Sequence, residues 1–405
     1  MSINNFNELG LSARLVNTLE KLGITEPTEI QRKTIPAAIA GRDILASAET
    51  GSGKTAAFLL PIIERLKQPE SRRALILVPT RELALQIETH AKLYRLSARL
   101  RTVSVVGGES AYKQIKALKS GVEILIATPG RLNDLIERGA VSLETFDTLV
   151  LDEADRMLDM GFLPQVRQIL RFFPKKRQTM LLTATLSRPI EQLARELLTD
   201  YVRVEAARKA TTVATLTQKA FHVLSHSKTP LVLALLKQHE EATFLIFTQT
   251  RRGADRLATI LKANKYEAVT LHSDRTQSQR NAALASFRSG RVRVLVATDV
   301  AARGIDVDNI SFVINYEVPA TAEDYIHRVG RTARAGRDGS ALTLVSPDEE
   351  YMMTTIERFT GIKLERSKVK GFSDGRSDEQ ISLASEIARL RAPSARSFSP
   401  SRASR

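Results

Sequence analysis

The chain has 405 residues, of which 43% are hydrophobic, and a formal net charge of +15 at pH 7; at about 150 residues a domain, this length predicts two or three domains. It contains no cysteine, which excludes disulfides and thiolate zinc sites, and no apolar run approaches the roughly 18 residues of a membrane helix. The basic charge favours a polyanion such as nucleic acid as the partner, and a membrane surface is disfavoured because no basic amphipathic helix with aromatic anchors is evident.

The two ends of the chain differ in composition. Residues 1–6 lack the charged and apolar regions of a signal peptide, so we expect a cytoplasmic protein. Residues 391–405 are rich in serine and arginine and contain no acid. Because such a segment cannot bury a core, residues 366–405 are predicted to form a flexible, basic tail. This tail would either hold a polyanion loosely or only keep the protein soluble.

A phosphate-binding loop is predicted near residue 50. Residues 42–48 form an apolar stretch that is typical of a buried strand, and a Gly-Ser-Gly-Lys-Thr sequence follows it at residues 51–55. Glycine accepts positive φ, so the loop can turn and point its N–H groups at a phosphate where a helix begins. Lys54 would then reach the β- and γ-phosphates, and the Thr55 hydroxyl would bind Mg²⁺. An ordinary Gly/Ser turn is the alternative, which the Gly-Lys-Thr ending disfavours. The residues expected to hold the nucleotide here are Ala48 (where the strict pattern has glycine), Glu49, Thr50, Gly51, Ser52, Gly53, Lys54 and Thr55.

A pair of carboxylates follows a second apolar strand. Residues 148–151 predict a buried parallel strand, and an Asp-Glu-Ala-Asp sequence follows it directly at residues 152–155. In open α/β sheets, ligands bind at the carboxyl ends of the strands. Asp152 is therefore the expected Mg²⁺ ligand, and Glu153 can orient or deprotonate an attacking water. A solvated acidic cluster is the alternative, but it would not explain why the charges begin so abruptly at the end of a strand. The loop and the carboxylates together predict hydrolysis of a nucleoside triphosphate.

Apolar runs alternate with helical patterns along most of the chain, which predicts an α/β fold with a mostly parallel sheet in each of two domains. We expect these domains at residues 1–205 and 216–365, because residues 206–215 have no apolar period and are typical of a linker. The strands expected in the first domain, besides the one before the phosphate loop, are residues 74–78, 102–106, 124–127, 148–151 and 179–182. Those expected in the second domain are residues 243–247, 268–271, 292–297, 312–315 and 341–345.

Taken in order, the motifs between about residues 6 and 346 resemble those of the DEAD-box RNA helicases of the short bacterial type. Besides the two motifs above, they include Pro-Thr-Arg-Glu-Leu at 79–83, Thr-Pro-Gly-Arg at 128–131, Thr-Ala-Thr at 183–185 and His-Arg-Val-Gly-Arg-Thr-Ala-Arg at 327–334. The resemblance implies two tandem RecA-like domains, with ATP and Mg²⁺ as cofactors and RNA as the partner. It also implies ATP hydrolysis stimulated by RNA, and local opening of short duplexes as the two domains close.

The resemblance extends the nucleotide site over both domains. Phe6 and Gln31 are spaced as in the family's adenine-reading motif, in which Gln31 would offer a donor and an acceptor to the base and Phe6 would stack on it. Asp306 resembles a ribose contact. Arg331 and Arg334 resemble the arginines that reach the γ-phosphate from the second domain, and on a helix their spacing of three would place them on one face. Hydrolysis should therefore require a closed cleft between the domains.

The resemblance also implies an RNA-binding surface made of groups that suit phosphate oxygens rather than base edges, so no sequence preference is expected. Residues Thr183, Thr185 and His327 are expected to couple the nucleotide and RNA sites. The family usually has serine at 183 and glycine at 333, so Thr183 and Ala333 leave the strength of that coupling open. The residues expected to bind RNA are Arg81, Gly107, Gly108, Thr128 and Arg131 in the first domain and Thr248, Arg280 and Thr298 in the second.

Two other functions remain open from the sequence alone. A DNA-translocating helicase would use similar tandem domains, and a non-enzymatic RNA clamp would keep the fold without the chemistry. The presence of Glu153, Arg331 and Arg334 argues against the clamp, and the resemblance of the ordered motifs to the RNA family argues against DNA. We expect a monomer without a membrane partner, working in a process such as ribosome assembly or RNA decay.

Overall fold

The computed structural model of the protein describes residues 5–48, 51–67, 73–94, 100–206, 216–302, 310–333, 338–367 and 372, with the side chain of Val300 excepted. These residues fall into two compact units, residues 5–206 and residues 216–367 with Phe372. The expected linker and tail lie mostly outside this part of the chain, and so do four of the expected site residues: Glu49, Thr50, Asp306 and Arg334.

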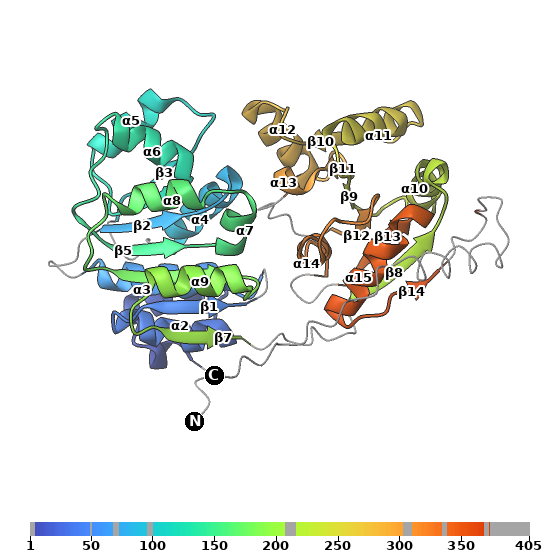
Figure 1. Ribbon diagram of the computed structural model, residues 1–405. Coiled ribbons are helices and arrows are strands. Elements are labelled where there is room, and N and C mark those ends of the chain that lie inside the picture. Colours follow the sequence, from blue (N-terminus) through green and yellow to red (C-terminus); the bar gives the residue numbers. More distant parts are fainter. Residues whose placement is uncertain are drawn as a thin grey trace, which may run out of the picture. The chain divides into compact units, whose positions relative to one another are not determined.

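The first unit contains a sheet of seven parallel strands in the order β3-β4-β2-β5-β6-β1-β7. Helices lie on both faces of this sheet (Figure 1). The strands are β1 (Ile44–Ser47), β2 (Arg73–Leu77), β3 (Thr102–Val105), β4 (Ile124–Ala127), β5 (Phe146–Leu151), β6 (Gln178–Thr183) and β7 (Val202–Glu205). The helices are the 3-10 turn η1 (Phe6–Leu9), α1 (Ala13–Lys21), α2 (Glu29–Ile39), α3 (Lys54–Arg65), α4 (Arg81–Tyr94), α5 (Ala111–Lys119), α6 (Pro129–Glu137), α7 (Ala154–Asp159), α8 (Leu163–Leu170) and α9 (Arg188–Leu197).

The strands of the first unit supply side chains to two apolar cores. Successive residues of a strand point to opposite faces of the sheet: Ile44 and Ala46 of β1 lie in the cluster formed with α1 to α4, whereas Leu45 lies in the cluster formed with α6, α8 and α9. Ile76 and Leu77 of β2 are divided between the two cores in the same way. Because helices cover both faces, the central strands are apolar almost throughout, and this made them detectable in the sequence.

The second unit contains another sheet of seven parallel strands, in the order β10-β11-β9-β12-β13-β8-β14 (Figure 1). The strands are β8 (Leu216–His222), β9 (Phe244–Phe247), β10 (Ala268–Leu271), β11 (Val294–Ala297), β12 (Phe312–Asn315), β13 (Gly339–Val345) and β14 (Glu365–Arg366). The helices are η3 (Ser225–Ser227), α10 (Lys228–Gln238), α11 (Arg251–Ala263), α12 (Gln277–Arg288), α13 (Asp299–Ala302), α14 (Ala322–Val329), η4 (Pro347–Glu349) and α15 (Glu350–Thr360).

The two sheets repeat one topology. If the strands of each unit are numbered from one to seven along the chain, both sheets have the order 3-4-2-5-6-1-7. In the first unit, β1 therefore lies between β6 and β7, and β5 lies beside β6. The carboxyl ends of β1, β5 and β6 consequently meet at one edge of the sheet, where ligands bind in folds of this kind.

The α/β architecture and the two parallel sheets confirm the fold class predicted from the sequence. Strands β4, β10 and β12 have the bounds expected, and the other expected strands are present with shifted ends. Three strands were missed, namely β7, β8 and β14. They lie at or next to one edge of their sheets and contain exposed polar residues, so none of them has a continuous apolar run. Arg366 of β14 and Phe372, which packs partly buried against the second unit, belong to the segment expected as a tail; the domain boundaries stay a prediction.

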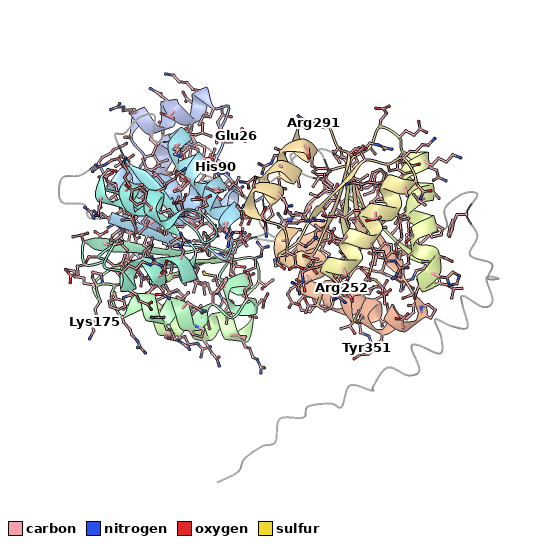
Figure 2. The ribbon with its side chains drawn as sticks, turned by 90° about the horizontal axis from the view of Figure 1, so that it is seen from above. Glu26, His90, Lys175, Arg252, Arg291 and Tyr351 are labelled. Carbon is pink, nitrogen blue, oxygen red and sulfur yellow. The ribbon has the colours of Figure 1, made fainter. Side chains whose placement is uncertain are left out.

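Arg156 and Arg328 are unusual in their burial. Most arginines are exposed, as Arg252 and Arg291 are at the surface of this protein (Figure 2). Arg156 and Arg328, in contrast, are only 2% exposed. Such side chains need partners inside the protein. Arg156 directly follows the acidic motif, and Arg328 belongs to the motif at residues 327–334.

Within the part of the chain that the structure describes, no helix has the length and apolar character needed to cross a membrane.

Candidate active site

At the carboxyl ends of the strands of the first sheet, backbone hydrogen bonds join the end of β1 to that of β6 and the end of β5 to that of β2. The N–H group of Ala48, which follows β1, donates to the carbonyl of Thr183 at the end of β6 over 3.1 Å. The N–H group of Asp152, which follows β5, donates to the carbonyl of Leu77 at the end of β2 over 3.0 Å. The ladder of the sheet thus continues into the loops and brings the predicted phosphate loop and the predicted carboxylates to one edge.

The phosphate loop has the backbone that its glycines were expected to allow. Gly51 and Gly53 have φ of +86° and +92°, and α3 begins directly after them at Lys54. The ammonium group of Lys54 donates to the carbonyl of Ala48, across the loop. The hydroxyl oxygen of Ser52 is buried and has no hydrogen-bond partner in the described part of the chain. A tight turn, a helix N-terminus, a lysine and an unused buried hydroxyl together fit a phosphate group.

Gln31 joins the start of α2 to this loop. Its side-chain oxygen accepts from the N–H of Thr28 over 2.9 Å, and its side-chain nitrogen donates to the carbonyl of Gly53 over 3.1 Å. A Cβ atom on Gly53 would collide with that nitrogen, so the loop needs glycine here for space as well as for its φ. Phe6 is 1% exposed and packs in the core of the first unit. The ring is therefore not open to a base in this structure, and its stacking on adenine stays a prediction.

Asp152 lies in surroundings that disfavour a lone negative charge. It is 3% exposed, and one carboxylate oxygen accepts from the N–H of Glu153 over 3.0 Å. Burial and, second, the charge of Glu153 raise the pKa of Asp152 to about 7, against the opposing effect of Lys54. A divalent cation would supply the positive charge that this carboxylate lacks. Its oxygen and the hydroxyl of the partly buried Thr55 are hard donors of the kind that Mg²⁺ prefers, so these two residues fit the ion expected from the sequence.

Glu153 has a backbone conformation that only a tightly held residue keeps. Its φ of 52° and ψ of 50° are left-handed, which costs about 1 kcal/mol or more for a residue with a Cβ atom. The residue stands at the N-terminal cap of α7, and its carboxylate pairs with the guanidinium of Arg156. The side chain of the expected water-orienting residue is thus held in one place by its own helix.

The last residue of the acidic motif links it to the expected coupling residues. One carboxylate oxygen of Asp155 accepts from the N–H groups of Ala184 and Thr185, both over 3.0 Å, and from the hydroxyl of Thr185 over 3.2 Å. The buried hydroxyl of Thr183 donates to the carbonyl of Thr185 over 2.8 Å. Asp155 was not among the expected site residues, although its position in the motif was a signal for it. A movement of the loop after β5 would therefore also displace the loop after β6, because these hydrogen bonds connect the two.

The expected RNA-binding residues of the first unit lie at three neighbouring strand ends. Arg81 begins α4 after β2, the two glycines follow β3, and Thr128 is the N-cap of α6 after β4. The guanidinium of Arg81 packs against Gly107 and Gly108, and a Cβ atom on Gly108 would collide with it. Arg131 donates to the side chain of Gln114 over 2.9 Å and to the carbonyl of Glu109 over 3.2 Å. These residues form one patch at the edge where β3, β4 and β2 end.

The expected RNA-binding residues of the second unit lie at the equivalent place. Thr248 follows β9, Arg280 belongs to α12 after β10, and Thr298 follows β11. The N–H groups of Thr248 and Thr298 donate to the carbonyls of Ala297 and Leu271 over 2.9 and 3.2 Å. In both units, these residues therefore follow strands two, three and four of the repeated sheet.

The arginine motif of the second unit corrects one expectation. Helix α14 ends at Val329, so Arg331 lies beyond it, and the argument that Arg331 and Arg334 share a helical face is wrong for Arg331. The side chain of Arg331 is 5% exposed and donates to the carbonyl of His327 over 3.2 Å. Ala333 has a φ of 54°, which is the conformation that favours the glycine usual in the resembling family.

Arg328 was missed by the sequence reasoning. Its guanidinium donates to both carboxylate oxygens of Asp299 over 2.6 and 2.7 Å and to the side-chain oxygen of Asn315 over 3.1 Å, and it lies 5.1 Å from the ring centre of Phe247. Since Asp299 directly follows Thr298, this ion pair ties α14 to the carboxyl end of β11. Its place in the motif at 327–334 was the available signal, but spacing alone does not tell which arginine turns inward.

Comparisons with known proteins identify the family of the chain. The model of the DEAD/DEAH box helicase family matches residues 28–193, and the model of the helicase conserved C-terminal domain matches residues 227–336. The chain is 40% identical over 369 residues to the DEAD-box ATP-dependent RNA helicase CshA of Geobacillus kaustophilus, covering 90% of this chain and 79% of the relative. It is 40% identical over 354 residues to RhpA of Helicobacter pylori, covering 87% and 72%.

Solved structures give the same answer for the fold. Dbp5 of S. cerevisiae, bound to RNA and ADP BeF3, is similar with a TM-score of 0.82 and 29% identity, covering 95% of this chain and 100% of that chain. The two parallel sheets are accordingly RecA-like domains in tandem. With relatives of 40% identity over most of its length and both family models matched in order, the chain belongs to the DEAD-box ATP-dependent RNA helicases.

Proposed function

We propose that this ATP-dependent RNA helicase holds ATP at the edge formed by β1, β5 and β6, hydrolyses it when RNA is bound, and opens short duplexes locally. The observation that carries the proposal is the network around Asp155. This carboxylate ties the acidic motif to Thr185 in the loop after β6, and the hydroxyl of Thr183, at the end of β6, donates to the carbonyl of Thr185. Such a link gives hydrolysis and RNA binding a common part that both can move.

The phosphate groups of ATP would be held by the loop between β1 and α3. The N–H groups at the start of α3 would donate to a phosphate bound there, and Lys54 would leave the carbonyl of Ala48 for the β- and γ-phosphates. Asp152 and Thr55 would hold Mg²⁺, which supplies positive charge beside the phosphates when it is bound. Glu153 would accept a hydrogen bond from the attacking water and so orient it. Gln31 would lend its amide to the adenine edge, as its family motif implies.

The second unit would complete the site with Arg331, and we propose the same role for Arg334 from the family motif. Both arginines would stabilise the charge that develops on the γ-phosphate, a contribution of about 10³–10⁵ in rate in other NTPases. They belong to a different unit from Asp152 and Glu153, so hydrolysis requires that the two units close on the nucleotide. RNA bound to both units would favour that closure.

RNA would be bound through its sugar–phosphate backbone. The groups proposed for this role in both units are threonines, glycines and arginines at strand ends, which suit phosphate oxygens and offer no code for bases. We therefore propose binding without sequence preference. A strand that must follow two such surfaces at once would be forced out of regular A-form geometry, and a short duplex would open locally rather than by long-range translocation.

The test is an ATPase assay with saturating RNA, matched DNA or no nucleic acid. Lys54→Ala should lose the RNA-stimulated activity, because the phosphates lose their cationic partner. Glu153→Gln should bind ATP and RNA but not turn over, so that the complex is trapped. Normal turnover by either variant, or equal stimulation by DNA and RNA, would reject the assignment. Unwinding rates for duplexes of increasing length distinguish the two modes. For local opening the rate must fall steeply as the duplex lengthens, whereas for translocation it must not.

The cellular setting is proposed more broadly. We propose that the protein acts as a monomer in the cytoplasm and that its RNAs belong to ribosome assembly or RNA decay. Cross-linking in cells, followed by sequencing of the bound RNA, identifies those RNAs directly. Light scattering of the purified protein gives its molar mass, and a value twice that of the 44.8 kDa chain would contradict the monomer.

A further inference from the structure

Arg156 directly follows the acidic motif and has an environment that its neighbours do not explain. The residue lies on α7, which packs against β6 and α9. Its side chain is 2% exposed, and one guanidinium nitrogen, Nη1, donates to the carboxylate of Glu153. The other two nitrogens, Nε and Nη2, are buried and find no hydrogen-bond acceptor among the residues described. A buried cation with unused donors is costly, so this position calls for a functional reason.

The carboxylates of Asp152 and Asp155 have other hydrogen-bond donors and are not paired with the Arg156 guanidinium in the described structure. One carboxylate oxygen of Asp155 accepts from the N–H of Arg156, and the other accepts from the N–H groups of Ala184 and Thr185. Asp152 accepts from the N–H of Glu153. Glu153 is therefore the one carboxylate that the described structure shows hydrogen-bonded to the Arg156 guanidinium. The dependence is mutual, since no other hydrogen-bond partner of the Glu153 carboxylate is seen in this part of the chain.

The pairing also restricts where Glu153 can point. The backbone of Glu153 is already in a left-handed conformation between β5 and α7, and a partner three residues along the same helix lies on the same side of it. A side chain anchored at both its backbone and its carboxylate keeps one orientation without reorganising during a reaction. Such preorganisation is what a group that must direct a water requires.

We propose that Arg156 is a positioning residue for Glu153: it holds this carboxylate in the orientation in which it directs the hydrolytic water. The inference rests on the role of Glu153 put forward above. In this proposal Arg156 acts through the carboxylate of Glu153 and not directly on nucleotide or water.

The kinetic test compares Arg156→Met and Arg156→Lys with the wild-type full chain at saturating RNA. Arg156→Met should lower kcat for ATP by about 10²-fold, the usual effect of a small misplacement of a reacting group, while KM for ATP and RNA affinity change by no more than about threefold. Arg156→Lys should recover part of kcat, because an ammonium group can still donate to Glu153. Arg167→Met is the matched control: Arg167 is exposed on α8 of the same unit and pairs with Glu196 over 2.8 Å, and its kcat should equal that of the wild type.

A second test uses the unfolding of the nucleotide-free protein, which does not depend on activity. Glu153→Gln removes the counter-charge of the buried guanidinium and should lower the Tm, and adding Arg156→Met to it should recover part of that loss. Additive Tm changes in this double-mutant cycle would overturn the pairing. If Arg156→Met does not fold, Arg156→Lys carries both tests.

The outcomes separate this inference from the proposed function. If Glu153→Gln turns over ATP normally, the role of Glu153 is wrong and that of Arg156 is wrong with it. If Glu153→Gln is inactive but Arg156→Met and Arg156→Lys keep the wild-type kcat, the inference about Arg156 alone is overturned. A loss of kcat in Arg156→Met with partial recovery in Arg156→Lys, unchanged KM and non-additive Tm values supports it.

Discussion

Asp152 and Glu153 are neighbours in the chain, yet the structure gives them opposite surroundings. Asp152 is buried, and its pKa is raised to about 7 by burial and by the charge of Glu153. Glu153 has a cationic partner in Arg156 and a partly open side chain. Environments that differ in this way separate the roles of paired carboxylates. The carboxylate without a hydrogen-bonded cation suits a metal ion, and the paired one suits a water.

The raised pKa of Asp152 predicts how stability depends on pH. Since its pKa rises from 3.8 to about 7 on folding, the folded protein binds more protons than the unfolded chain between these values, and the free energy of unfolding falls as pH rises through that range. The loss is on the order of 4 kcal/mol, from a rise of about three pKa units at 1.36 kcal/mol each. Asp152→Asn removes this term, so its Tm without nucleotide should exceed the wild-type Tm at pH 8 by more than at pH 4.

The control for this prediction is Asp200→Asn, at a side chain that is 87% exposed. Its Tm difference from the wild type should be the same at both pH values. A wild-type Tm that does not fall relative to Asp152→Asn as pH rises would contradict the buried, cation-poor position of Asp152.

Ala333 is the second residue whose conformation makes a prediction. Its φ of 54° is left-handed and costs an alanine about 1–2 kcal/mol, whereas glycine accepts it and loses roughly 0.5–1 kcal/mol through chain entropy. Ala333→Gly should therefore raise the free energy of unfolding by about 0.5–1 kcal/mol and keep ATPase activity. Urea unfolding measures the change. In the exposed helical position Ala285, the same exchange should instead destabilise by about 1 kcal/mol.

At the scale of elements, the two units use their strands alike. The residues proposed for RNA follow strands two, three and four in both sheets. In the first unit, the phosphate loop, the two carboxylates and the proposed coupling residues lie at the ends of strands one, five and six. Side-chain links then join elements that the ladder does not. Asp155 joins α7 to the end of β6, and Arg328 joins α14 to the end of β11. In each unit, a buried charged residue thus links a helix to the loop at a strand end.

Breaking the ion pair between Arg328 and Asp299 in the second unit should reduce both the stability of the protein and its RNA-dependent activity. Arg328→Met leaves Asp299 without its partner, so the free energy of unfolding should fall by about 3 kcal/mol, and helix α14 should lose its fixed position relative to Thr298. RNA affinity and RNA-stimulated kcat should then decrease together, as measured by fluorescence anisotropy and by phosphate release. Arg252→Met, at an exposed arginine of α11 (Figure 2), should change neither. A variant that loses stability but keeps both activities would contradict the link.

At the scale of the whole molecule, the groups proposed for catalysis are divided between the two units. Asp152 and Glu153 belong to the first and Arg331 to the second. Neither unit therefore contains the full proposed site, and the rate of hydrolysis should depend on whatever brings the units together. RNA is the partner that the chemistry of both surfaces suits.

Arg331→Ala tests this division. The variant should bind ATP and RNA with wild-type affinity, because both sites in the first unit stay intact, but its kcat should fall by about 10³-fold or more. ATP affinity is measured with a fluorescent analogue and kcat by phosphate release. Arg358→Ala, at an exposed position of α15, is the control. A kcat for Arg331→Ala close to that of the wild type would show that the first unit hydrolyses ATP alone.

Much of the fold followed from the sequence because the central strands are buried on both faces and are therefore continuous apolar runs. The outer strands β7, β8 and β14 were missed because partly exposed strands lack that run. The phosphate loop and the acidic motif could be recognised in the sequence because each is a short run of adjacent residues directly after a strand. The buried roles of Arg156 and Arg328 were missed because spacing does not show whether an arginine faces solvent or the core.

The sequence by itself determined the chemistry and the class of fold, since both depend on residues that are close together along the chain. Only the tertiary structure decided which distant residues meet: Gln31 with Gly53, Asp155 with Thr185, and Arg328 with Asp299. The physical reason is the order of the strands. Parallel strands joined by helical crossovers bring all their carboxyl ends to one edge, but periodicity does not encode that β1 lies next to β6. That order places the phosphate loop, at the end of β1, beside Thr183 at the end of β6, one of the residues proposed to couple hydrolysis to RNA binding.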